Sequence, residues 1–196
     1  GDRLGNDFVI VHQLDGGQKD QHWLDWLAEK PFSTLFVDGN HENFDLMNAL
    51  PEKEWHGGRV HEVRENILHL MRGQIFAFSG LTWFTMGGAS SHDIQDGVLD
   101  PDPDFEQKYW LLRRMRGMFR VKGRSWWAEE MPNAREYVEA LKNLEQVNWK
   151  VDCILSHCGP SSSVRKIAPS YGSDQLTDFL ETVNQRCQFT YWFFGH

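Results

Sequence analysis

The stretch TLFVDGNHENFDLMNALP (residues 34–51) decides which fold the chain is expected to adopt. Its apolar run at residues 35–37 predicts a short strand, and the spacing of Leu46, Met47 and Leu50 predicts a helix that ends at Pro51. A polar segment, DGNHE, lies between the two. Because open α/β sheets present ligand-binding side chains where strands end, this segment is a candidate functional site.

A structural role explains the same segment equally simply. Gly39 permits an unusual backbone angle, and Asn40 is a residue type that caps helices. The segment is then only a turn and a helix cap. A functional interpretation requires matching residues elsewhere in the chain.

Length and composition predict one cytoplasmic domain over residues 1–196 that does not enter a membrane. The three cysteines, Cys153, Cys158 and Cys187, show no paired spacing and are typical of reduced thiols. The net charge of -8 makes nucleic acid an unlikely partner. It also means that a phosphate substrate would need local cations or a metal.

Apolar patterns predict an α/β fold that contains mixed parallel and antiparallel sheets. Strands and helices alternate near both ends of the chain, as in a parallel sheet, with the first strand expected at residues 7–12. Short strands joined by tight turns over residues 59–86 predict an antiparallel meander between these parts.

Three predicted strands end in metal-ligating residue types. Asn40 and His41 follow the first of these strands, His157 follows the strand at residues 151–156, and His196 follows the last one. Imidazole nitrogens and amide oxygens are ligands for Zn, Mn or Fe, and strand ends can converge at the edge of a sheet. The order of the three patterns favours one shared site.

With the motifs GNHE (residues 39–42), SHC around His157 and GH (residues 195–196), the chain resembles the calcineurin-like metallophosphoesterase superfamily. The resemblance implies a four-layer α/β/β/α sandwich and a hydrolase that uses two divalent metal ions, Mn, Fe or Zn. It implies that Asn40, His157 and His196 bind the second metal and that His41 acts as proton donor or charge stabiliser at the leaving oxygen. A metal-activated water would then cleave phosphate mono- or diesters. The substrate would be a phosphorylated small molecule, a nucleotide or a phosphoprotein.

The chain departs from the family pattern in its first-metal motifs. It lacks the initial Asp-x-His, and Leu14 stands where the bridging Asp is expected, so that Asp15 is one residue late. The second His of the closing GHxH is also missing after His196. We therefore expect a domain truncated at both ends that binds one metal ion or fewer, with Asp15 as a possible bridging ligand. The alternative is a catalytically defective member that binds a phosphate ligand or a protein.

Three further features have both a functional and a structural interpretation. His92 and Asp93 either reach the substrate or form a hydrogen-bonded turn. Cys158 and Arg165 suggest a cysteine phosphatase, but six residues separate them instead of five, which favours a packed cysteine. The basic run at residues 113–124 either guides phosphorylated or nucleic-acid ligands or is a solvated face.

Overall fold

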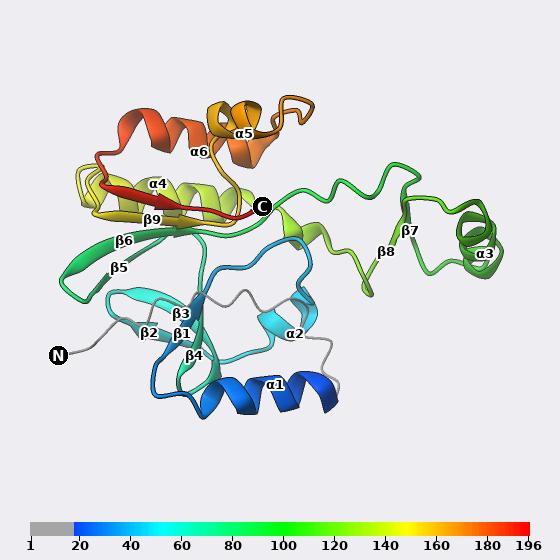
Figure 1. Cartoon of the computed structure of the whole chain (residues 1–196), viewed down its shortest axis with the longest axis horizontal. Coiled ribbons are helices and arrows are strands. Elements are labelled where there is room, and N and C mark those ends of the chain that lie inside the picture. The colour runs from blue at the N-terminus through cyan, green and yellow to red at the C-terminus, as the bar shows by residue number, and fades with distance from the viewer. Residues whose placement is uncertain (1–17) are drawn as a thin grey trace.

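The computed structural model describes residues 18–196, which form a mixed α/β fold with two four-stranded sheets (Figure 1). The first sheet has the order β1-β4-β3-β2 and consists of β1 (Thr34–Phe36), β2 (Glu52–Trp55), β3 (Gly58–Arg64) and β4 (Ile67–Leu70). The second has the order β10-β9-β6-β5 and consists of β5 (Gln74–Phe78), β6 (Leu81–Met86), β9 (Cys153–Ser156) and β10 (Tyr191–Phe193). The strand expected at residues 7–12 lies outside the described residues.

Both sheets are mixed, as the sequence predicts. β1 pairs parallel to β4, and β9 pairs parallel to both β6 and β10. The β2–β3, β3–β4 and β5–β6 pairs are antiparallel.

The expected meander is wrong as a single unit, because its four strands form two hairpins in different sheets. The chain changes sheets at residues 71–73. The Met71 amide donates to the Arg59 carbonyl in the first sheet, whereas the Gly73 amide donates to Thr85 in the second. Gly73 has a positive φ of 71° and lies against Ala140, where a Cβ atom would clash.

Three apolar clusters hold these elements together. Leu24 and Leu27 of α1 (Gln18–Ala28) and Met47 of α2 (Phe44–Asn48) pack against Phe36 and Ile67 of the first sheet. The second sheet packs against α4 (Ala134–Gln146) and α6 (Gln175–Arg186) through a cluster that includes Phe84, Ile154, Ala140, Leu144, Leu176 and Leu180. A third cluster joins the sheets to each other and contains Val60, Leu68, Leu70, Phe76, Trp83 and Cys153.

An excursion over residues 94–127, here called the arm, extends away from the two sheets (Figure 1). It contains the short parallel pair β7 (Val98–Leu99) and β8 (Arg120–Val121) and the helix α3 (Phe105–Met115), which has no buried residue. A 3-10 turn, η1 (Ala128–Glu130), follows the arm, and α5 (Ser161–Ile167) follows β9. Within residues 18–196, no helix has the length and apolar character needed to cross a membrane.

Candidate functional site

The loop after β1 does not use Asn40 as a helix cap. Asn43 is the N-cap of α2, and its side chain accepts a hydrogen bond from the Leu46 amide at 3.1 Å. The capping explanation for Asn40 is therefore wrong. Asn40 instead lies buried in the loop, with 5 % of its surface exposed.

A chain of hydrogen bonds orients the Asn40 amide. Its Nδ2 donates to Ser91 Oγ at 3.2 Å, and that hydroxyl donates to Glu130 Oε2 at 2.6 Å. The Ser91 amide donates to the other carboxylate oxygen of Glu130 at 2.9 Å. Because Ser91 Oγ gives its only proton to Glu130, it must accept from Asn40, which establishes which amide atom is the nitrogen.

The other Asn40 amide atom, Oδ1, is buried and has no hydrogen-bond partner among residues 18–196. An unsatisfied buried acceptor typically costs about 1–3 kcal/mol, so such an atom calls for an explanation. A neutral amide oxygen held in a constant orientation is a suitable cation ligand. The donor set therefore fits a metal at this point.

His157 and His196 lie side by side, with Nε2 of the first 3.2 Å from Nδ1 of the second. They follow β9 and β10, which are adjacent parallel strands. The amides of Gly195 and His196 both donate to the His157 carbonyl, at 3.1 and 3.0 Å, which holds the two segments together. Desolvation of the His196 ring, followed by the nearby His92 and His41, lowers its pKa and favours the neutral form that binds metals.

The loop after β1 reaches this histidine pair from the other sheet. Gly39 lies so close to the His157 ring that a Cβ atom would stand 2.5 Å from Cε1. The Gly88 amide, which follows β6, donates to the Asp38 carbonyl at 2.9 Å. The three strand ends therefore converge across two sheets rather than at one edge of a single sheet, because β1 belongs to the first sheet and β9 and β10 belong to the second.

His41 contacts the arm. Arg120 Nη2 lies 3.3 Å from His41 Nδ1, and Arg120 also forms an ion pair with Asp93 Oδ2 at 2.5 Å. Arginine can only donate, so His41 Nδ1 must accept and the ring proton of neutral His41 resides on Nε2. Arg120 also holds the pKa of Asp93 below its usual range, chiefly through their hydrogen bond.

His92 lies beside the histidine pair. Its ring stacks on Tyr171 with centroids 4.7 Å apart and lies 5.4 Å from the His196 ring. The structure thus brings His92 to His196 and connects Asp93 to His41 through Arg120. Asp15 lies outside the described residues.

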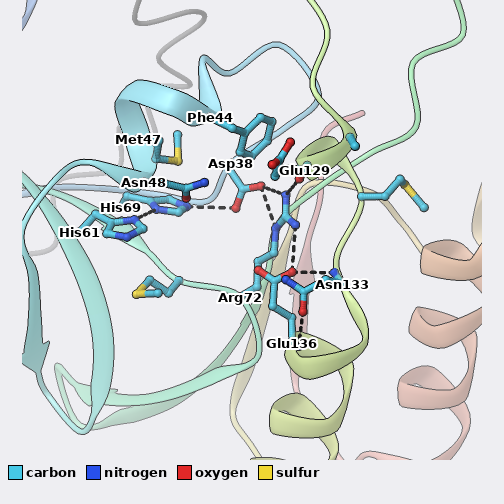
Figure 2. A pocket seen from close by; sticks show the side chains of 13 residues that line it. Asp38, Phe44, Met47, Asn48, His61, His69, Arg72, Glu129, Asn133 and Glu136 are labelled. Atoms are coloured by element: carbon cyan, nitrogen blue, oxygen red, sulfur yellow. Dashed lines mark hydrogen bonds and ion pairs between the residues drawn. The ribbon is translucent and has the colours of Figure 1, made fainter. Parts of the chain in front are cut away.

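A buried polar network supports the loop from the side shown in Figure 2. Asp38 accepts from Arg72 Nε and Nη2, at 2.9 and 2.5 Å, and pairs with His69 Nε2 at 3.0 Å. Although burial opposes ionisation, Arg72 and His69 hold the pKa of Asp38 well below its usual range. His69 Nδ1 in turn lies 3.0 Å from His61 Nδ1.

This network lines a cavity of about 380 Å³ between α2 and the segment that follows η1. Five side chains of its lining already bind one another and support the loop, namely Asp38, His61, His69, Arg72 and Glu136. Arg72 also donates to the Glu129 carbonyl at 2.8 Å and to Glu136 at 3.3 Å. No sequence motif marks these residues, and the one signal that could have found them is the position of Asp38 after a predicted strand.

Glu42, the last residue of GNHE, is buried. Burial and the negative charge of Asp38 raise its pKa to about 8, although a hydrogen bond from the Gly39 backbone lowers it. Cys158 is also buried, and burial raises the pKa of its thiol to about 12. The Cys158 thiol donates to the Gly88 carbonyl at 3.4 Å, which agrees with a packed cysteine and not with a nucleophile.

Among residues 18–196, no group of three or more His, Cys, Asp or Glu side chains has the arrangement of a metal site. The candidate ligands are therefore two imidazoles, His157 and His196, and the amide oxygen of Asn40. Comparisons with protein-family models, curated proteins and solved structures found no match to this chain.

Proposed function

We propose that this protein is a metal-dependent phosphoesterase of the calcineurin-like superfamily that cleaves phosphate mono- or diesters. The observation that carries the proposal is the unsatisfied Asn40 Oδ1 in the loop that packs against His157, which is itself paired with His196. A divalent cation held by these three side chains would explain the buried acceptor and the close approach of two imidazole nitrogens.

The architecture supports the same assignment. Helices α1 and α2 pack on the first sheet, α4 and α6 pack on the second, and an apolar cluster joins the two sheets. We infer from these contacts a four-layer α/β/β/α sandwich, with the site where loops from both sheets meet.

The chain's own residues have distinct roles in this proposal. Asn40, His157 and His196 hold the cation, while Ser91 and Glu130 keep the Asn40 oxygen aimed at it. A cation of this kind supplies charge that stabilises phosphoryl oxygens and makes a water easier to deprotonate. Mn, Fe and Zn all suit a site of imidazole and amide ligands.

His41 is the proton donor to the leaving oxygen. Arg120 occupies its Nδ1, so the proton of the neutral ring is on Nε2, the nitrogen that we assign to the leaving oxygen. Asp93 anchors Arg120 through their ion pair. The leaving alkoxide takes the Nε2 proton as its bond to phosphorus breaks. The imidazolate that this leaves is stabilised by the Arg120 guanidinium at Nδ1 and regains its proton from water. General acid catalysis contributes about 10²–10⁴-fold in rate.

One observation favours a second candidate function. Because residues 18–196 contain no cluster of three or more acidic, His or Cys ligands, they hold at most part of a two-metal centre. A catalytically defective protein that binds a phosphate ligand or a partner protein would have this property. The two functions differ in turnover and not in metal binding by Asn40 and the histidine pair.

The test measures bound metal and turnover in the same variants. After incubation with Mn²⁺ and dialysis, inductively coupled plasma spectrometry should find about one ion per chain. Asn40→Ala and His157→Ala should lose the ion and the activity together. His41→Ala should keep the ion and lose about 10²–10⁴-fold in kcat, mostly with alkyl phosphates and less with p-nitrophenyl esters.

His22→Ala is the matched control, since His22 is an exposed histidine on α1. It should change neither metal content nor turnover. Loss of the ion from His41→Ala would show that His41 is a ligand and that its assignment as the acid is wrong. Metal binding without any hydrolysis of these esters by the unaltered chain would favour the defective-member function.

A further inference from the structure

The arm combines one exposed and three half-buried aromatic rings with arginines in one groove. The groove has a volume of about 640 Å³, and the side chains that matter most in it are Phe105, Tyr109, Trp110, Phe119, Arg113 and Arg124. Trp110 is 63 % exposed, although tryptophan is among the side chains that gain most from burial. The packing of α3 therefore leaves a large ring available to a ligand.

The charge of the arm is opposite to that of the whole chain. Residues 94–127 contain seven Lys and Arg, all of them after residue 104, against five acids, Asp96, Asp100, Asp102, Asp104 and Glu106, so the arm has a charge of +2, whereas the chain has a net charge of -8. The two lysines are neutralised by ion pairs, Lys108 with Asp102 at 2.7 Å and Lys122 with Asp100 at 3.1 Å.

The arginines of α3 and of the turn after β8 lack such partners. Within residues 18–196, no ion pair involves Arg113, Arg114, Arg116 or Arg124. Two of them lie over rings of the groove instead. The guanidinium carbon of Arg124 is 5.6 Å from the Phe105 centroid, and that of Arg113 is 6.0 Å from Tyr109. Guanidinium groups beside aromatic faces can contact phosphates while the rings stack with bases.

We propose that this groove binds single-stranded nucleic acid. Unpaired arginines supply contacts to the phosphates, and Trp110 supplies a stacking platform for an unpaired base. Glu106 lies in the groove but accepts a hydrogen bond from Trp110 Nε1 at 3.0 Å, which orients the indole. Duplex DNA is a poorer ligand, because its bases are already stacked on each other. The net charge of the chain argues against nucleic acid only if its charges are spread evenly, and in the arm they are not.

An acidic polypeptide is the other ligand that arginines attract. It would use the guanidinium groups but would gain little from four aromatic rings interleaved with them. The combination of rings and unpaired cations therefore favours a polynucleotide. This inference does not depend on the metal site, because binding to the arm requires neither a cation nor turnover.

Fluorescence anisotropy with a labelled single-stranded DNA of roughly 12 nucleotides tests the proposal, with EDTA present to prevent cleavage. We expect a Kd of about 10⁻⁵ M or tighter at about 50 mM salt, with weaker binding as salt rises. Trp110→Ala should weaken binding roughly 5- to 150-fold, the range that stacking of one base covers. The double variant Arg113→Gln/Arg124→Gln should reduce the slope of log K against log salt by about 1.4.

The matched control variants replace similarly exposed residues that lie outside the arm. Trp23→Ala on α1 removes a ring that is 58 % exposed, and Arg135→Gln removes an exposed arginine at the start of α4. Both should bind as the unaltered chain does. Circular dichroism should show all four variants folded, since the substituted side chains are exposed.

Three outcomes would overturn the proposal. The first is no change in anisotropy at protein concentrations up to about 100 μM, the weak limit of non-specific binding. The second is equal weakening by the control variants. The third is that duplex DNA or poly-glutamate competes as effectively as unlabelled single strands do. Binding to the arm would then result from charge attraction alone.

Discussion

Acidification should destabilise this protein through the buried pair His61 and His69. Their Nδ1 atoms lie 3.0 Å apart, so one nitrogen must carry a proton and the other must not (Figure 2). Burial, followed by the charge of His69, lowers the pKa of His61 to about 4. Glu52, which lies 3.8 Å from His61 Nε2, and Asp38 oppose this shift, and Arg59 adds to it.

The direction of the pH effect follows from the two pKa values of His61. An unfolded histidine titrates near pH 6.5, and the folded value is about 4, so the unfolded chain binds more protons between these limits. The contribution of His61 to the free energy of unfolding is therefore fully present above about pH 6.5. It is lost as the pH falls towards 4. Between pH 7 and pH 5 the loss is about 2 kcal/mol for this one group.

Urea unfolding of the protein and of His61→Asn at pH 7 and pH 5 measures this loss. Asparagine keeps an N–H donor near the position of Nδ1 but does not titrate. The free energy of unfolding should therefore fall by about 2 kcal/mol more in the unaltered protein than in the variant. His22→Asn, at an exposed histidine, should behave as the unaltered protein does. Equal losses in the unaltered protein and in His61→Asn would refute the reasoning.

Three further predictions concern the residues around the loop. Arg72→Leu leaves the buried charge of Asp38 without its main partner and should cost about 3–5 kcal/mol in urea unfolding, part of which Asp38→Asn should restore. Gly39→Ala places a methyl group against the His157 ring. The variant should therefore lose about 1–3 kcal/mol of stability and retain less Mn²⁺ after dialysis. Unchanged Mn²⁺ content would contradict the close approach of Gly39 to His157. Cys158→Ser should leave any phosphoesterase turnover, as proposed above, within a few-fold, because the thiol donates to a backbone carbonyl. A complete loss with metal still bound would point to a cysteine mechanism.

The local pattern of the sequence was enough to determine the elements that surround the site. Short apolar runs that end in Gly or polar residues predicted β1, β9 and β10, because strand propensity and turn chemistry are local properties of the sequence. The same patterns placed Asn40, His157 and His196 directly after these strands. The motif order also indicated a metal-ligand set, which stays a prediction.

The orientation of those side chains depended on residues far away in the chain. Ser91 and Glu130, which aim the Asn40 amide, are 51 and 90 positions from it, and Arg120, which contacts His41, is 79 positions away. No periodicity links residues at such separations, since only packing of the loops brings them together.

The tertiary structure also decided which sheet each strand joined and where charge accumulated. A run of short strands with turns is compatible with one meander, and only the sheet change at residues 71–73 divides it into two hairpins. Likewise, the net charge of -8 is a sum over the whole chain and does not show where the charged residues lie in the fold. Among residues 18–196, the fold pairs Lys108, Lys122 and Arg120 of the arm with aspartates and leaves Arg113, Arg114, Arg116 and Arg124 without an ion pair, because such pairs form only between groups that the fold places within a few ångströms.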